Sequence, residues 1–538
     1  MNRLKSFWCE GEGCALLSSI RIKQGISIDM CIELGKEIPT VAKVIMTIVD
    51  SSKETIPIPF QEYRNASRHY LTVSISPNEF TRPYPRWYLC VIGGADGCDG
   101  KSFSVKTTRW IKLKFMLHRL LFRLNDGSSY VPHITPFWKS LQFIRRELSD
   151  YENRFLRIRE VISCVTYYAT QSYWNRRKLI LMYDRPARAQ DNAEYLFSYI
   201  MQHTPGDVRK RVFFVIDKKC PDYQRVACYG NHVVPFMSLR YLVYLQAARY
   251  MIGSHPYYSA YLKDAMPSLV TRDLYKKPLF NLQHGVIALK NVANILEAKR
   301  FPQGSKLLAS SEWERSIVCD HLGWNAKDVP VLGLARWDVL ESRTDTDTPF
   351  VLYMPTFRHW LYYATRDRLA KSEFACAINS LLHSERLQHI LVQNNATLKF
   401  YCHPAMHEKM SLFEQNIPNV EFIHEGGRPL NELIMECSCM ITDYSSICCD
   451  AFFIKKPVIF YQFDQERFLS ETGSYFDFNQ LPGTLCLNEE ATLDALTRSF
   501  KTTGHTEEMV TETSHWFKYH DHNNCQRIFT YLKQEGWF

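Results

Sequence analysis

The sequence predicts an α/β protein in which two doubly wound parallel-sheet domains follow a small β-sandwich-like domain. From residue 178 onward, short apolar runs of strand length alternate with helical patterns, which is typical of parallel strands joined by right-handed crossovers. The alternation restarts near residue 345, so we expect two such domains, at about 175–340 and 345–500. Before them, residues 20–106 carry short period-two runs separated by Gly, Pro and Asn clusters, and these predict the β-sandwich.

The composition is that of a globular protein with a modest excess of positive charge. The chain has 538 residues, too many for one core, and 46% of them are hydrophobic. Its formal net charge of +9 is compatible with an anionic substrate, an anionic membrane surface or nucleic acid. The 17 cysteines are scattered without CxxC pairs, which favours reduced thiols in a cytoplasm. Neither a signal peptide nor an apolar run of about 18 residues is found, so we expect the protein inside the cell or on the inner face of its membrane.

A basic amphipathic pattern lies between the β-rich region and the first α/β domain. Residues 106–124 combine Lys and Arg with apolar side chains and include no acidic residue. Such a helix can lie in an anionic membrane interface or pack between domains with its basic side solvated, and both interpretations stay open. A second helical region is predicted from Phe137 to Thr166. The expected parts are a β-rich accessory domain at 1–108, a helical linker at 109–175, an α/β half at 176–342, and a second half at 343–538 with closing C-terminal helices.

Polar residues follow five of the predicted strands, at the sheet edge where parallel sheets bind ligands. A strand-end His can act as a base near neutral pH, and an Arg suits bidentate phosphate binding. Ser445 and Ser446 begin a helix after a strand, where they can cap the helix or hold a phosphate oxygen. Together the five groups predict a cleft for a diphosphate. They are Gln283–His284–Gly285, Gly333 with Arg336 and Asp338, Thr356 with Arg358, His403–Pro404, and Asp443 to Ser446.

Several other functions lose support because their motifs are absent. The sequence has no G-x-x-x-x-G-K-[ST] loop, no G-x-S-x-G elbow and no HExxH helix, which argues against an ATPase, a serine hydrolase and a zinc protease. The cysteines near residue 440 match no zinc pattern, and we expect no metal site. Basic residues are dispersed outside 106–123 and no aromatic RNA motif occurs, so nucleic-acid binding is not expected.

Seven segments between about residues 178 and 490 resemble the CDP-glycerol glycerophosphotransferase family, whose members prime and polymerise wall teichoic acids and related capsules. The chain departs from the usual family pattern in one place, because Val286, Ile287 and Ala288 stand where Thr and Pro usually follow the Gly. The matching segments are QHGVIALK (283–290), LLASSEWE (307–314), GLARWD (333–338), YMPTFR (353–358), CHP (402–404), ITDYSSICCD (441–450) and KPVIFYQFD (456–464).

The resemblance implies a GT-B fold and an enzyme bound peripherally to the cytoplasmic face of the cell membrane. It also implies roles for individual residues. His284 matches the likely general base on the acceptor hydroxyl, and His403 would lie against the donor diphosphate. Arg358, Ser445 and Ser446 would hold phosphate oxygens, while Asp443 and Asp450 would orient the turn or contact the nucleotide. The predicted substrate-binding set is completed by Thr356, Lys290, Arg336 and Asp338.

The expected reaction is transfer of glycerol phosphate, or another polyol phosphate, from a CDP-activated donor to a hydroxyl of a lipid-linked acceptor. The acceptor hydroxyl would attack the β-phosphorus and CMP would leave, with no cofactor and no obligatory metal. One alternative is a GT-B glycosyltransferase that uses a nucleotide sugar in the same cleft. Another is a non-catalytic scaffold that binds polymer through the β-rich domain.

Overall fold

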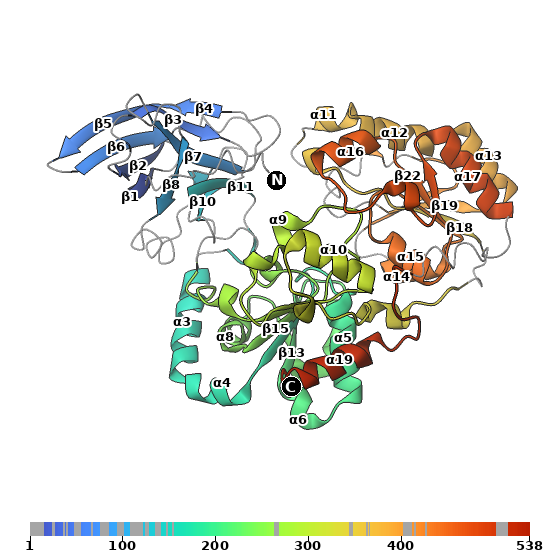
Figure 1. Cartoon of the computed structure of the whole chain (residues 1–538), viewed down its shortest axis with the longest axis horizontal. Helices are drawn as coiled ribbons and strands as arrows, with labels where there is room; N and C mark the ends of the chain where they lie inside the picture. The colour runs from blue at the N-terminus through green and yellow to red at the C-terminus, as the bar shows by residue number, and fades with distance from the viewer. Residues whose placement is uncertain are drawn as a thin grey trace. The chain divides into compact units, whose positions relative to one another are not determined.

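The computed structural model of the chain contains two compact units (Figure 1). The first comprises residues 1–166 and 261–272, and the second comprises residues 167–260 and 273–538. Each unit has its own hydrophobic core. The residues that the structure describes are 15–23, 27–35, 38, 41–47, 55–65, 68–75, 86–93, 102–107, 122–123, 129–134, 141–146, 149–152, 155–262, 268–343, 348–361, 364, 366–401, 412–413, 416–424, 428–501 and 515–538.

The first unit is built on a mainly antiparallel β-sheet. Its strands connect in the order β5-β6-β2-β1-β8-β7-β11-β10-β9, and β3 pairs with both β4 and β7. Burial alternates along β2, where Ile28, Met30 and Ile32 face the core, as the period-two pattern predicts. The strands are β1 (Ala15–Lys23), β2 (Ser27–Leu34), β3 (Val41–Thr47), β4 (Thr55–Ile58), β5 (Phe60–Asn65), β6 (Arg68–Ile75), β7 (Arg86–Gly93), β8 (Ser102–Thr107), β9 (Phe122–Arg123), β10 (Ser129–Ile134) and β11 (Leu141–Arg146).

The predicted β-rich domain is confirmed, but the described strands do not form the two separate sheets of a sandwich. They make one hydrogen-bonded network of 11 strands. Strand β7 connects the parts of this network, because it pairs with β3, β8 and β11. Alternating apolar residues determine which face of a strand is buried, and they leave the choice of partner strand open. That choice could not be read from the sequence.

The helical linker predicted over 109–175 is wrong in part. Strands β10 and β11 pair with each other, and β11 continues the sheet through β7. Leu141 and Phe143 are buried in the core of the first unit, so packing on the sheet decides the conformation of this segment. The segment 106–124, predicted as a basic helix, includes the last two residues of β8 and both residues of β9. Residues 108–121 and 124 lie outside the described residues. Among the described residues, the first helices are α3 (Leu156–Ala169) and α4 (Gln171–Arg177).

The second unit contains the two predicted parallel sheets. The first has the order β14-β13-β12-β15-β16-β17, and the second has the order β20-β19-β18-β21-β22-β23. In chain order both are 3-2-1-4-5-6, the order of doubly wound folds. The inner strands, such as β12, β13, β18, β21 and β22, are buried and nearly all apolar, as expected for sheets covered on both faces. The strands of the two sheets are β12 (Ile180–Tyr183), β13 (Val212–Ile216), β14 (Val233–Pro235), β15 (Tyr250–Gly253), β16 (Leu279–Asn281), β17 (Lys306–Leu307), β18 (Phe350–Tyr353), β19 (Thr397–Tyr401), β20 (Val420–Ile423), β21 (Cys439–Thr442), β22 (Val458–Tyr461) and β23 (Thr484–Cys486).

Helices connect these strands, and the last one returns to the first sheet. The C-terminal helix α19 packs against α5 (Figure 1), and Trp537 stacks on Tyr250 with ring centroids 4.4 Å apart. Among the described residues, no helix is long and apolar enough to span a membrane. The α-helices are α5 (Asn192–His203), α6 (Gly206–Arg209), α7 (Tyr223–Val226), α8 (Leu239–Ala247), α9 (Ala293–Leu296), α10 (Glu312–Leu322), α11 (Arg366–Ala370), α12 (Glu373–Leu382), α13 (Glu385–Gln393), α14 (Leu430–Glu436), α15 (Cys448–Phe453), α16 (Gln465–Glu471), α17 (Glu489–Lys501) and α19 (Asn524–Gln534).

Candidate active site

The candidate site is built on the points where the strand order of each sheet reverses. In the first sheet the order reverses between β12 and β15, and in the second between β18 and β21. Crossover connections leave these strands toward opposite sides, which opens a crevice beyond their carboxyl ends. Most of the polar residues singled out from the sequence follow these strands or their neighbours.

A buried carboxylate fixes the loop between β12 and α5. Asp184 follows β12 directly and accepts hydrogen bonds at 3.1 to 3.2 Å from the backbone N–H groups of Asp191, Ala193 and Glu194. Ser254 Oγ donates a further bond to it at 2.5 Å. Burial and the nearby charge of Asp191 raise the pKa of Asp184 well above its usual value. These bonds place Asp191 at the N-cap of α5.

A strained turn after β16 presents His284 to solvent. The preceding residue, Gln283, has a φ of 61°, a left-handed conformation that is unfavourable for a residue with a side chain. Asn192 Nδ2 donates to the Gln283 carbonyl at 2.8 Å, and Gln283 Nε2 donates to Glu314 Oε1 at 3.1 Å. Glu314 also accepts from the backbone N–H of Ile287 at 2.6 Å. The turn is thus held on both sides of His284, whose side chain remains 62% exposed.

His284 belongs to an acid–base cluster with Asp191 and His255. Its Nδ1 donates a hydrogen bond to Asp191 Oδ2, which fixes the tautomer and leaves Nε2 to accept a proton. The ring of His255 lies 4.7 Å from the ring of His284, and His255 Nε2 lies 3.5 Å from Asp191 Oδ2. Arg185 Nε donates to the same His255 nitrogen at 3.2 Å.

The surroundings keep Asp191 ionised and His255 neutral. Burial opposes ionisation of Asp191, but His284, Arg336 and His255 outweigh it and lower the pKa of the carboxylate. Burial and the nearby His284 and Arg185 lower the pKa of His255 well below its usual value. His284 is the exposed imidazole of the cluster, and the ionised carboxylate of Asp191 accepts the hydrogen bond from its Nδ1.

Arg336 ties this cluster to the second sheet. Its Nη1 donates to Asp191 Oδ1 at 3.2 Å and to the carbonyl of His284 at 2.9 Å. Its Nε and Nη2 donate to the two carboxylate oxygens of Asp450 in α15, each at 2.9 Å. Trp337 Nε1 donates to the same carboxylate at 2.7 Å. Sequence reasoning selected Arg336 and Asp450 as substrate ligands, whereas the structure shows them bound to each other between the two sheets.

Arg358 is the centre of a second buried ion cluster. Its Nε and Nη2 donate to Asp464 at 2.7 and 2.8 Å, and its Nη1 donates to Asp443 at 2.7 Å and to the Thr356 carbonyl. The guanidinium also lies 4.8 Å from the ring of Tyr444. Because its side chain is fully buried and each of its nitrogens already donates, the predicted contact of Arg358 with phosphate has no support. The structure assigns it to holding the two carboxylates.

Other predicted residues gather at the carboxyl ends of β18 and β21. Asp443 accepts from the backbone N–H of Thr356 at 2.9 and 3.0 Å, and Thr356 Oγ1 is buried without a hydrogen-bond partner in the described part of the chain. Burial lowers the pKa of Lys290 to about 8, with Asp443 opposing the shift and Arg358 adding to it. Gly285 abuts Ser446, since a Cβ atom at residue 285 would overlap the Ser446 hydroxyl. The turn after His284 therefore touches the turn that carries Ser445 and Ser446.

Of the two remaining predicted site residues, Asp338 has another role and His403 is not among the described residues. Asp338 accepts hydrogen bonds from the backbone N–H groups of Asn524 and Cys525 at 2.8 and 2.7 Å. These bonds cap the N-terminus of α19, so the prediction of Asp338 as a substrate ligand has no support. His403 lies outside the described residues, which resume at 412 after Tyr401 at the end of β19.

Sequence reasoning missed Asp184, Asp191, His255 and Asp464. His255 directly follows Ser254 at the carboxyl end of β15, so the criterion that selected His284 would also have selected it. From the sequence, Asp191 could be recognised only as a candidate N-cap of the following helix. Nothing in the sequence connects it to His284, which lies 93 residues further along the chain.

Asp191, His255 and His284 also bring three potential metal-ligating atoms within 4.8 Å of one another. These atoms already serve in hydrogen bonds, because His255 Nε2 accepts from Arg185 and Asp191 accepts from His284 and Arg336. Two guanidinium groups beside the cluster would also repel a divalent cation. The donor set therefore fits proton transfer better than metal binding.

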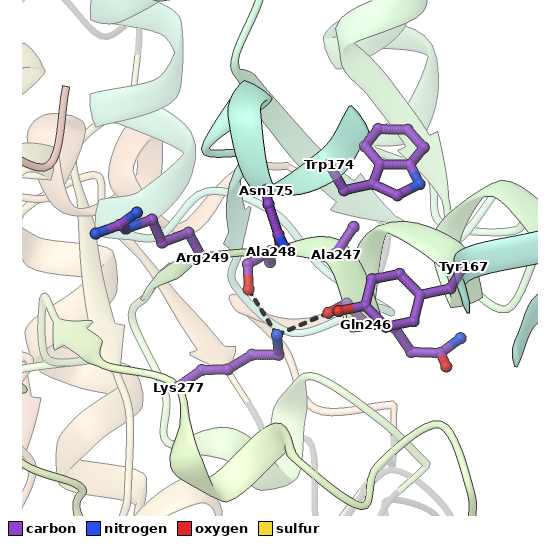
Figure 2. A pocket seen from close by; sticks show the side chains of 8 residues that line it. All are labelled: Tyr167, Trp174, Asn175, Gln246, Ala247, Ala248, Arg249 and Lys277. Atoms are coloured by element: carbon purple, nitrogen blue, oxygen red, sulfur yellow. Dashed lines mark hydrogen bonds between the residues drawn. The ribbon is translucent and has the colours of Figure 1, made fainter. Parts of the chain in front are cut away.

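Figure 2 shows a pocket at the opposite edge of the first sheet. Arg249 immediately precedes β15 and Lys277 lies just before β16, so the pocket is at the amino ends of these strands. Lys277 Nζ donates to the carbonyls of Gln246 and Ala248 at 2.8 and 2.6 Å, at the C-terminal end of α8. Lys277 thus satisfies helix carbonyls, and the pocket is separate from the His284 cluster.

We expect Arg358→Gln to lower the free energy of unfolding by about 3–5 kcal/mol, because it leaves two buried carboxylates without a cationic partner. Arg386→Gln is the matched control, since Arg386 pairs with Asp494 on the surface and should cost less than about 1 kcal/mol. Denaturant unfolding of both variants measures the difference. Equal losses would show that the buried cluster adds nothing to stability.

We expect Asp338→Ala to destabilise the protein by about 1 kcal/mol, because α19 loses its cap. Glu341→Ala, which changes an exposed carboxylate nearby, serves as the control. Hydrogen exchange of the α19 amides reports the effect locally. Unchanged exchange in α19 would contradict the capping role.

Comparison with known proteins identifies the relatives of this chain. The minor teichoic acid biosynthesis protein GgaB of Bacillus subtilis is 26% identical over 424 residues, which are 76% of this chain and 45% of GgaB. The teichoic acid ribitol-phosphate polymerase TarL of Staphylococcus aureus is 23% identical over 305 residues, which are 52% of this chain and 51% of TarL. The chain thus spans about half the length of these curated relatives. A solved structure of the wall teichoic acid polymerase TagF aligns with 14% identity and a TM-score of 0.47, covering 70% of this chain and 98% of that one.

The resemblance noted in the sequence is confirmed by a family model. The model of the CDP-glycerol:poly(glycerophosphate) glycerophosphotransferases matches residues 166–534, more than half of the chain. This range includes both parallel sheets and every residue of the His284 cluster. The chain therefore belongs to the CDP-glycerol:poly(glycerophosphate) glycerophosphotransferase family.

Proposed function

We propose that this protein transfers a polyol phosphate from a CDP-activated donor to a hydroxyl group of an acceptor in the synthesis of a teichoic-acid-like polymer. The observation that carries the proposal is the exposed imidazole of His284, held by Asp191 at the switch point of the first sheet. Family membership supports the reaction class. The curated relatives include ribitol-phosphate polymerases and glycerol-phosphate primases, so CDP-ribitol and CDP-glycerol are both candidate donors.

On the acceptor side, His284 acts as the general base. Its Nε2 takes the proton of the attacking hydroxyl while the hydroxyl oxygen forms a bond to the β-phosphorus of the donor. The bond between that phosphorus and the bridging oxygen breaks, and CMP leaves with the electron pair. Asp191 stabilises the imidazolium that forms, as the carboxylate does in other His–Asp pairs.

On the donor side, Lys290, Thr356 and the Ser445–Ser446 turn meet the diphosphate. The charges of Asp443 and Arg358 both act on the Lys290 ammonium. The Thr356 hydroxyl has no hydrogen-bond partner in the described structure. Ser446 touches Gly285, so this turn is next to the base. A charge and hydroxyl groups in fixed positions can stabilise the negative charge that builds up as CMP departs. His403 in the segment after β19 remains a prediction for the same role.

The two parallel sheets correspond in this proposal to the halves of a GT-B fold. The shared 3-2-1-4-5-6 order supports this assignment, because each half then has its own switch point. The first sheet, which carries His284, would take the acceptor. The second sheet, which carries Thr356 and Asp443, would take the CDP-activated donor.

The acceptor is proposed to be lipid-linked, with the protein bound peripherally to the cytoplasmic face of the membrane. The support is a set of exposed apolar side chains on α3 and on α4, and α4 also carries basic residues in its last turn. A helix with such side chains can insert into the headgroup region of a bilayer. The exposed apolar side chains are Phe155, Ile158, Val161, Ile162, Val165, Tyr168 and Tyr173.

The first test is release of CMP from CDP-glycerol or CDP-ribitol in the presence of a lipid-linked acceptor analogue. His284→Ala should lower kcat/KM by about 10²–10⁴-fold, the usual contribution of a general base. His203→Ala replaces an exposed histidine at the end of α5 and is the control. Turnover only with nucleotide sugars would support a glycosyltransferase instead, and no turnover with any donor would leave the scaffold alternative.

Binding of CDP should weaken as the pH rises through about 8. Lys290 has a pKa lowered to about 8, so it is charged below this pH and attracts the diphosphate, and it loses the charge above it. Lys290→Arg keeps its charge across this range and should remove the pH dependence. Calorimetric titration between pH 6.5 and 9.5 measures the effect. An identical pH profile in the variant would exclude Lys290 from the donor site.

Membrane binding should depend on the exposed apolar side chains of α3. The double variant Ile158→Ser/Val165→Ser should sediment less with vesicles that contain anionic lipid, because it removes two inserted side chains. Val392→Ser on α13 is the control, since it also removes an exposed apolar side chain. Equal sedimentation of all three proteins would leave α3 without a role at the membrane.

A further inference from the structure

Two arginines of the loop between β12 and α5 have no charged partner among the described residues. Arg185 is exposed and donates only its Nε, to His255 at 3.2 Å, so its terminal nitrogens remain available. Arg188 is half-buried, and its guanidinium lies 5.9 Å from the ring of Tyr401. Neither side chain forms an ion pair with a carboxylate of the described chain, in contrast to Arg336 and Arg358. The backbone N–H of Arg188 donates to the Arg185 carbonyl at 3.0 Å, so both arginines stand on one short turn next to His255. Guanidiniums without a carboxylate partner can bind an anion, and phosphate matches their planar fork.

The loop that carries both arginines is held in place, so their position is preorganised. Asp184 anchors its start. In its middle, the carbonyl of Pro186 accepts from the backbone N–H of Asp217 at 2.8 Å. Near its end, the backbone N–H of Ala189 donates to Asp222 at 3.1 Å. A ligand bound here does not have to order the loop, which favours affinity.

The position of Arg185 defines which phosphate it can reach. Arg185 bonds His255, and the ring of His255 lies 4.7 Å from that of His284. An anion on Arg185 is therefore separated from the base by the width of one imidazole. Arg188 lies over Tyr401, the last residue of β19. In an acceptor that ends in a polyol phosphate, one polyol unit separates the attacking hydroxyl from the preceding phosphodiester, which suits this spacing.

We propose that Arg185 and Arg188 bind the phosphodiester next to the attacking hydroxyl, so that the protein prefers acceptors that already end in a polyol phosphate. This inference rests on the proposed function and adds to it the class of acceptor. An acceptor that ends in an unsubstituted sugar has no phosphate for this subsite. The arginines thus select chain extension over the first addition to a sugar.

The test compares two lipid-linked acceptors, one ending in a single glycerol phosphate and one ending in the sugar alone, with CDP-glycerol as donor. For Arg185→Gln/Arg188→Gln, the preference for the phosphate-ended acceptor, measured as a ratio of kcat/KM values, should fall about tenfold or more. Arg249→Gln is the matched control. Arg249 is also exposed and near a Tyr ring, but at the opposite sheet edge. An unchanged ratio, or a rise in the donor KM alone, would overturn the proposal, the latter by assigning the arginines to the donor phosphates.

A second measurement separates this inference from the proposed reaction. Calorimetry with a short glycerol phosphate oligomer needs no turnover, and Arg188→Gln should weaken its binding about tenfold. Arg188 contacts neither His255 nor His284 in the structure, so this variant leaves the base cluster in place. Oligomer binding that is lost in Arg188→Gln would support the subsite even if CMP release failed. Equal binding to the variant and the wild type would refute it even if CMP release succeeded.

Discussion

The structure of the site depends on the buried guanidinium of Arg336. It joins Asp191, at the end of the first sheet, to Asp450 in α15, beside the second sheet, and its side chain is buried. Removing such an ion from water costs several kcal/mol, which only well-placed carboxylates offset. Arg336 also donates to the carbonyl of His284, so the side chain that links the two sheets also holds the backbone of the exposed imidazole.

The two buried ion clusters support the site, and other side chains are left to contact a ligand. Arg336 and Arg358 are buried and saturated with carboxylates, so they shape the loops and have little left for a ligand. Other groups beside them are exposed or have no carboxylate partner. They are His284, which is bonded to Asp191, Arg185, which is bonded to His255, and Lys290, which lies near Asp443. Rigid support behind a few free groups is what catalysis by electrostatic preorganisation requires.

The limits of prediction from the sequence follow from the range of the interactions. The two parallel sheets were predictable, because buried strands such as Val212–Ile216 are continuous apolar runs. His284 and Asp443 could be selected from the sequence because each follows such a strand. The partners of these residues were not predictable, since Asp191 meets His284 across 93 residues and Arg336 meets Asp450 across 114. Asp338 follows a predicted strand but caps α19. Residues 129–134 and 141–146 form strands because they pack on a sheet whose strand partners cannot be read from the sequence.

The central claim is that His284 and Asp191 act as one unit, and a double-mutant cycle on CMP release tests it most directly. If Asp191 acts only through the imidazole, adding Asp191→Asn to His284→Ala should cause almost no further loss of kcat/KM, although each change alone is costly. This is the result that the hydrogen bond between the two side chains predicts. Losses that simply multiply would show that the two residues act independently and would contradict the account.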